Sequence, residues 1–90
     1  MSSSAPDRSP RAASVHVSAD ELIVTLRDGR RIASPLTWYP RLLAATPEAR
    51  ANCELLGGGT GIHWPDVDED LSVEGLLEGR PSAERRVPRR

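Results

Sequence analysis

The chain contains no lysine and no phenylalanine, and it has a single cysteine. The absence of lysine excludes a phosphate-loop lysine and any Schiff-base chemistry on a lysine amine. One cysteine cannot form an internal disulfide, and no apolar segment resembles a secretory signal, which together favour a reducing cytoplasm. No run approaches the roughly 20 apolar residues that cross a membrane. The sequence therefore predicts a soluble cytoplasmic protein.

Charge and composition divide the chain into one domain and two tails. The 12 basic and 13 acidic residues give a formal net charge of −1, which argues against non-specific affinity of the whole chain for nucleic acid or anionic membranes. Residues 1–13 are rich in serine, proline and alanine without an apolar period, and we expect them to be disordered. Residues 14–79 are expected to form a single α+β domain, and residues 80–90 a disordered, arginine-rich tail.

The start of the domain alternates apolar and other residues in the manner of β-strands. Val15 and Val17 alternate with polar neighbours, and residues 22–27 continue the pattern. Asp28-Gly29 is a strong hairpin signal before a return strand. We therefore expect three antiparallel strands here.

Three helix starts follow these strands. Thr37 can cap a helix that begins near Trp38, Thr46 followed by Pro47 starts a second, and Ser72 caps a third. The predicted fold is α+β: a small antiparallel sheet from N-terminal strands and a central hairpin, with two or three short helices packed on it.

The central hairpin is predicted around a glycine-rich connection at residues 57–61, because residues 53–56 and 61–64 are both strand-like. The same glycines could cradle a phosphate. Phosphate loops, however, run from a strand into a helix, and these glycines run into another strand in a chain without lysine. A hairpin turn is the preferred interpretation.

The densest set of ligand-type side chains is His63, Asp66, Asp68, Glu69 and Asp70. Its alternating aspartates begin as a calcium loop does, but Leu71 stands where that loop needs glycine and Leu77 where it needs glutamate. We therefore predict no metal site. The acids either solvate a loop and complement the N-terminus of the following helix, or they present an acidic surface to an arginine-bearing partner.

Other reactive residues lack the partners that catalysis requires. Cys53 could act as a thiol nucleophile with His16 or His63, but a lone cysteine in a predicted strand is more often buried and inert. No activating pair is evident, so we expect neither an enzyme nor a cofactor.

The three aromatic residues have two interpretations. Trp38, Tyr39 and Trp64 could stack on bases, but in a chain without phenylalanine they are better explained as the bulk of a small core. Because Pro65 follows Trp64, that indole could still leave an edge exposed to a partner.

Two runs, L-x-W-Y-P-R-L-L-x-A-T-P-E-x-R-x-N and G-x-G-I-H-W-P-D-x-D-E-D-L-S-V-E-G-L-L, closely resemble a bacterial family known as domain of unknown function 2442. The resemblance covers residues 15–79 and implies a small α+β fold. It also implies pairing with a second small protein from a neighbouring gene, in an arrangement similar to a toxin–antitoxin pair. Some relatives carry an added C-terminal helix-turn-helix, for which this chain has too few residues after Gly79. The family supplies no catalytic residues.

The functional prediction is a non-enzymatic protein-interaction module, the antitoxin-like or adaptor half of a two-gene pair, with a small companion protein as its partner. The alternative is a regulatory protein that binds nucleic acid through arginines near the first hairpin and in the C-terminal tail. The predicted partner-binding residues are Trp38, Tyr39, Arg41, His63, Trp64, Asp66, Asp68, Glu69 and Asp70.

Overall fold

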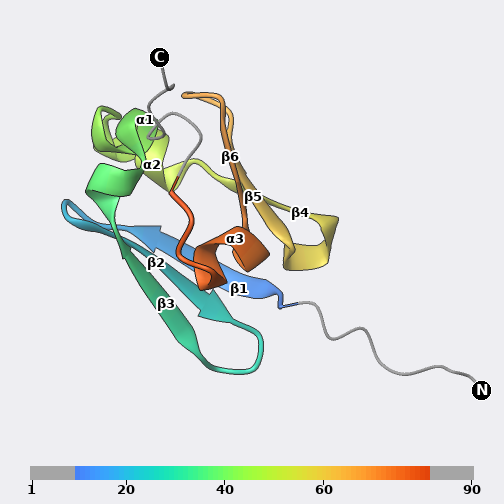
Figure 1. The fold of residues 1–90 in the computed structure, drawn as a ribbon. Helices are drawn as coiled ribbons and strands as arrows, with labels where there is room; N and C mark the ends of the chain where they lie inside the picture. The colour runs from blue at the N-terminus through green and yellow to red at the C-terminus, as the bar shows by residue number, and fades with distance from the viewer. Residues whose placement is uncertain (1–9, 82–90) are drawn as a thin grey trace, which may run out of the picture.

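A computed structural model of the chain describes residues 10–81 and shows the predicted α+β fold (Figure 1). The elements, in order, are β1 (Ala12–Val17), β2 (Glu21–Leu26), β3 (Arg31–Pro35), the 3₁₀ helix η1 (Leu36–Trp38), α1 (Pro40–Leu43), α2 (Pro47–Ala51), β4 (Glu54–Leu56), the 3₁₀ helix η2 (Gly57–Gly59), β5 (Gly61–Trp64), β6 (Glu69–Ser72) and α3 (Val73–Leu77). The strands form two separate antiparallel sheets of three strands each.

The N-terminal sheet has the order β1-β2-β3, as the alternating pattern predicted. Leu22, Val24 and Leu26 of β2 are buried, while the residues between them lie toward the outer side. The turn between β2 and β3 contains Gly29 at a φ of +97°, a conformation that glycine adopts without a steric penalty. The Asp28-Gly29 hairpin is therefore confirmed.

The C-terminal sheet, β4-β5-β6, contains the predicted central hairpin and one strand more. Residues 66–70 were expected to form a loop, but residues 69–72 pair with β5, so that Trp64 lies opposite Glu69 and His63 opposite Asp70. The expectation was wrong because two adjacent acids hid the alternation of this strand. Glu69 is buried on its inner side, whereas Asp70 is exposed.

Two of the three predicted helix starts are confirmed by their caps. The hydroxyl of Thr46 accepts a hydrogen bond from the amide of Ala49 at 3.1 Å, and that of Ser72 accepts one from the amide of Gly75 at 2.9 Å. The helix expected near Trp38 begins later, at Pro40. Proline disfavours helical dihedrals in the preceding residue, and Tyr39 accordingly has a φ of −129°.

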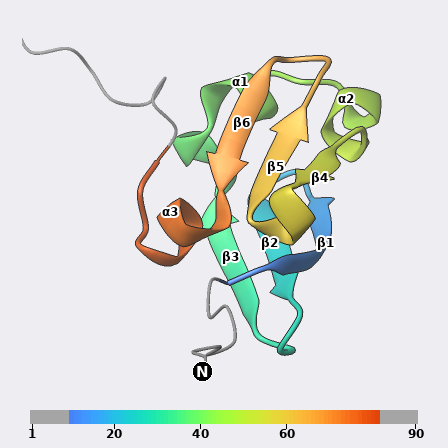
Figure 2. The same ribbon diagram turned by 90° about the vertical axis from the view of Figure 1, so that its right-hand side faces the viewer.

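The two sheets pack face to face around one core, with α3 beside them (Figure 2). This core consists of Ala12, Leu22, Val24, Leu26, Leu36, Tyr39, Leu42, Ile62, Trp64, Val73 and Leu76. Helix α3 contacts β3 and β6 and covers one side of the sandwich. On the opposite side lie β1 and β4, the other edge strands of the two sheets.

The boundary of the domain differs from the predicted one at its N-terminus. Strand β1 begins at Ala12, whose side chain is completely buried, so the predicted disordered tail of residues 1–13 extends two residues too far. Residues 1–9 of that tail, and residues 82–90 of the predicted tail of residues 80–90, lie outside the described residues. Between residues 10 and 81, no helix has the length and apolar character needed to span a membrane.

Candidate functional site

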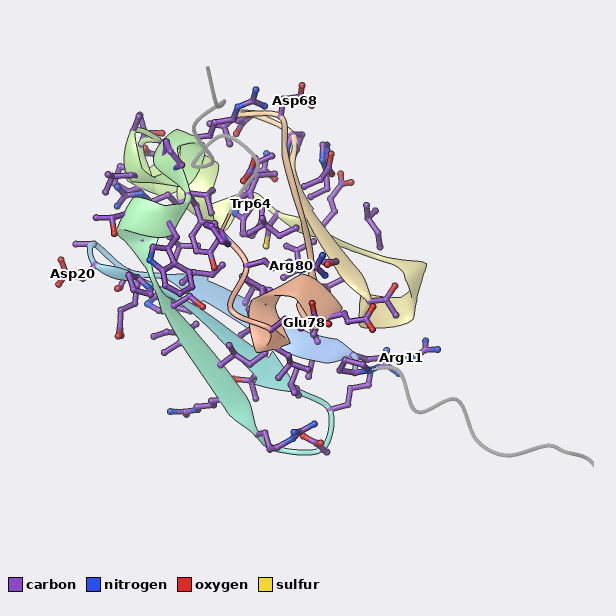
Figure 3. The ribbon with its side chains drawn as sticks, in the orientation of Figure 1. Arg11, Asp20, Trp64, Asp68, Glu78 and Arg80 are labelled. Atoms are coloured by element: carbon purple, nitrogen blue, oxygen red, sulfur yellow. The ribbon has the colours of Figure 1, made fainter. Side chains whose placement is uncertain are left out.

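Three of the predicted partner-binding residues lie inside the molecule. Trp64 and Tyr39 are fully buried, and Glu69 is 5% exposed. Trp64 lies on the inner side of β5, where its Nε1 donates a hydrogen bond to the carbonyl of Arg50 at 3.1 Å (Figure 3). The expected exposed edge of Trp64 is therefore wrong, because the register of β5 directs this side chain into the core.

Tyr39 and Glu69 belong to a buried polar contact with Ser34, which is 5% exposed. Burial raises the pKa of the Tyr39 hydroxyl, and the nearby Glu69 carboxylate raises that pKa further, while the adjacent Ser34 side chain opposes the shift. These residues come from β3, β6 and the segment between η1 and α1. They join the two sheets and cannot contact a partner without unfolding.

Three of the predicted acids, Asp66, Asp68 and Asp70, do remain exposed, at or beside the turn between β5 and β6. The carboxylate of Asp66 accepts a hydrogen bond from Nδ2 of Asn52 at 3.1 Å. Asp68 has a φ of +54°, and its carbonyl accepts a hydrogen bond from Nη1 of Arg41 at 2.6 Å. Figure 3 shows Asp68 at the tip of this turn. Arg41 therefore has a structural role, holding the turn against α1.

The remaining predicted residues are partly accessible. Trp38 is half-buried against the core. His63 lies on the outer side of β5, with its Nδ1 at 2.6 Å from Oδ1 of Asp70 on β6. Glu54 of β4 is the residue opposite His63 on its other side, which completes a row across the sheet. Residues 10–81 contain no cluster of histidine, cysteine and acidic side chains that could hold a metal ion.

The leucines of β4 were missing from the predicted site. Leu55 and Leu56 are 40% and 44% exposed, and within residues 10–81 β4 pairs only with β5. Leu56 lies on the outer side with the row of Glu54, His63 and Asp70, whereas Leu55, opposite the buried Ile62, faces the inner side at the open edge; we name the five residues together the β4 surface. The alternation of the central hairpin predicted a strand here but not its position at the edge, so local patterns did not indicate that both leucines would be accessible.

Cys53 immediately precedes β4 and is partly buried against the core. Burial raises the pKa of its thiol, which lowers the fraction of reactive thiolate at neutral pH. This environment is that of a packing residue.

A groove also lies on the side of the domain opposite α3. It has a volume of about 440 Å³ and lies between β1 and α2. Its walls include Val15, Val17 and Ala19 on one side and Pro47, Arg50 and Ala51 on the other. None of these residues belonged to the predicted site, because contacts between a strand and a helix 30 residues apart do not appear in local sequence patterns.

The model of the family described as a protein of unknown function, DUF2442, matches residues 12–82. The chain belongs to this family. The residues that match the DUF2442 model include every helix and strand described above, from β1 to α3. No curated protein matches this chain.

Two solved structures resemble this DUF2442 domain. A protein of unknown function from Rhodospirillum rubrum, known from a crystal structure, is 35% identical with a TM-score of 0.70; the match covers 83% of this chain and 93% of that one. An uncharacterised protein from Chromobacterium violaceum, known from solution NMR, is 27% identical with a TM-score of 0.69, over 81% of this chain and 69% of that one. Both support the fold.

Proposed function

We propose that this DUF2442 domain is a non-enzymatic protein-interaction module that binds a companion protein through the β4 surface. The observation that carries the proposal is the pair of leucines, Leu55 and Leu56, exposed on an edge strand beside the acids Glu54 and Asp70. Apolar side chains bordered by polar ones are typical of the surfaces at which proteins associate.

The chemistry of the β4 surface suits a protein partner. Full burial of a leucine contributes about 1.5–3 kcal/mol, so two half-exposed leucines offer a useful share of a binding energy. An edge strand also presents backbone groups to which an extended segment can pair. The acids at the border would favour a partner that carries arginine or lysine and would accelerate its association.

The proposed biological role is that of the antitoxin-like or adaptor half of a two-gene pair. The resemblance to DUF2442 proteins supports this role, because pairing with a small companion is what that resemblance implies. The buried positions of Tyr39, Trp64 and Glu69 narrow the proposed contact from the predicted acidic rim to the β4 surface.

Co-purification of the tagged, full-length chain from its native cell tests the proposal, followed by reconstitution of the complex from the two purified proteins. Leu56→Asp should weaken the affinity at least about tenfold, since it buries a charge in the interface. Leu77→Asp is the matched control, because Leu77 is 42% exposed on α3 and lies outside the β4 surface. Equal binding by both variants, or no stable protein partner, would overturn the proposal.

Nucleic-acid binding through arginines is the second candidate function. Arg27, Arg30 and Arg31 are exposed around the β2–β3 hairpin, although Nε of Arg30 already pairs with Asp28 at 2.8 Å. Such binding would weaken steeply as salt is added, because released counterions drive it. Triple substitution of these arginines by glutamine, followed by filter binding at two salt concentrations, tests this candidate; unchanged binding would reject the hairpin as its site.

A further inference from the structure

The groove between β1 and α2 is a second candidate site, separate from the β4 surface. The two share no residue, and the groove walls are largely apolar. Among the residues that line it, Arg50 and His16 are the titratable ones, and neither is acidic. An occupant of this groove would therefore meet aliphatic side chains and positive charge.

Arg50 is held rigidly at this groove. Its Nε donates a hydrogen bond to the carbonyl of Leu42 at 2.9 Å, and its Nη2 donates one to the carbonyl of Leu43 at 2.8 Å. The carbonyl of Arg50 in turn accepts the hydrogen bond from Trp64. A guanidinium has five N–H donors, so these contacts leave three of them unused within residues 10–81. A positioned guanidinium with spare donors binds a carboxylate with little further loss of side-chain entropy.

The other wall of the groove is an edge strand. In residues 10–81, β1 pairs with β2 alone, along residues 12–17. Val15 and Val17 lie opposite the buried Val24 and Leu22, so they belong to the inner side, whereas His16 lies on the outer side. An extended chain that paired with β1 would thus alternate its side chains between the groove and solvent.

We propose that the groove between β1 and α2 binds an extended peptide segment that carries an aspartate or glutamate. The segment adds as a strand to the edge of β1, its apolar side chains contact Val15, Val17 and Ala51, and its carboxylate pairs with Arg50. The partner segment is acidic, in contrast to the basic partner that suits the β4 surface. The domain would then hold two different proteins, or two segments of one protein, along the side that α3 does not cover.

Titration of the ¹⁵N-labelled full-length protein with the peptide acetyl-Val-Thr-Asp-Thr-Val-amide, whose valines and aspartate share one face when extended, tests this proposal by NMR. Amide shifts should concentrate at residues 15–19 and 48–51. The matched peptide with asparagine in place of aspartate should bind at least about tenfold more weakly, because it loses the charge-assisted hydrogen bonds.

Ala51 provides a matched pair of variants, because it lines the groove at the exposed C-terminal end of α2. Ala51→Lys should tighten binding of the aspartate peptide, and Ala51→Glu should weaken it, each by roughly two- to fivefold for an exposed charge. Neither substitution removes a contact of Arg50, so both proteins should fold. Leu56→Asp should bind the peptide as the unmodified protein does, which separates this site from the β4 surface.

Several results would overturn the proposal. These are equal affinity for the aspartate and asparagine peptides, no response to charge at Ala51, and shifts confined to Leu55 and Leu56. Shifts at β1 that depend on protein concentration without peptide would also overturn it, since they would show that a second copy occupies the groove. A folded Arg50→Gln variant, which lacks the guanidinium charge, should bind the aspartate and asparagine peptides with equal affinity.

Discussion

The indole of Trp64 on β5 donates a hydrogen bond to the carbonyl of Arg50 on α2, 3.1 Å away. The guanidinium of the same arginine binds the carbonyls of Leu42 and Leu43 at the end of α1. Arg50 therefore joins β5 of the C-terminal sheet to α1 and α2. Helices of four and five residues have little stability of their own, so this junction largely fixes their positions.

Arg50→Ala should lower the free energy of unfolding by about 1–3 kcal/mol, because two carbonyls of α1 lose a charged hydrogen-bond donor. Urea denaturation monitored by tryptophan fluorescence measures this change. Arg27→Ala is the matched control, since Arg27 is exposed beside the β2–β3 turn, and its effect should stay within about 0.5 kcal/mol. Similar losses in the two variants would contradict the role assigned to Arg50.

The single tyrosine should make the protein less stable in alkali. Because burial raises the pKa of Tyr39 in the folded state above its usual value of 10.0, the unfolded chain loses this proton first. The contribution of the protonated Tyr39 hydroxyl to the free energy of unfolding is fully present below pH 10 and is lost as the pH rises from there toward the folded-state pKa. Melting temperatures between pH 8 and 11 should fall more steeply for the unmodified protein than for Tyr39→Phe.

The chain suits this alkaline experiment, because it has no lysine and only one tyrosine. Burial also raises the pKa of Cys53, so both proteins should carry Cys53→Ala to remove the second alkaline titration. Ultraviolet absorbance of the phenolate then reports on Tyr39 alone. Titration of the folded protein at the pKa of free tyrosine would show that the hydroxyl is accessible to water.

Glycine substitutions should separate backbone strain from close packing. Gly29 and Gly59 have φ values of +97° and +106°, but a Cβ at Gly29 would meet nothing within 4 Å, whereas one at Gly59 would lie 2.7 Å from the carbonyl oxygen of Ala12. Gly29→Ala should cost about 1–2 kcal/mol from strain alone. Gly59→Ala should cost more, because the backbone of β1 must also move. Thermal unfolding of both variants gives the comparison, and equal costs would contradict it.

The cap of α3 should contribute measurably to stability. Ser72→Ala removes the acceptor for the amide of Gly75 and should destabilise the protein by about 1 kcal/mol. Ser14→Ala is a suitable control, because Ser14 is exposed in β1. Circular dichroism during heating measures both, and an unchanged midpoint for Ser72→Ala would show that packing alone holds α3.

Local chemistry explains which features could be predicted from the sequence. The caps at Thr46 and Ser72 and the turn at Asp28-Gly29 depend on neighbouring residues, and the structure contains all three. The α+β class and the central hairpin followed from apolar alternation. Strand β6 did not, because Glu69 is an acid at an inward position, which the hydrophobic pattern of a strand does not anticipate.

The candidate site was less predictable because it depends on which strand lies at an edge. The same apolar character that buries Trp64 on β5 leaves Leu55 and Leu56 exposed on β4, and only the strand order distinguishes them. Likewise, no local pattern distinguishes Arg50 from the other arginines, because its contacts depend on where α1 and the groove lie. Long-range arrangement, which local patterns do not encode, decides both cases.

Helix α3 covers the flank formed by β3 and β6, whereas the opposite flank is covered only in part, where α2 and η2 contact β1. A further strand, whether from a partner or from a misassembled copy, can therefore add to the sandwich only along the flank formed by β1 and β4. Two molecules joined back to back through that flank would each present only a capped flank outward, so the assembly would terminate as a pair and could not propagate into a fibre.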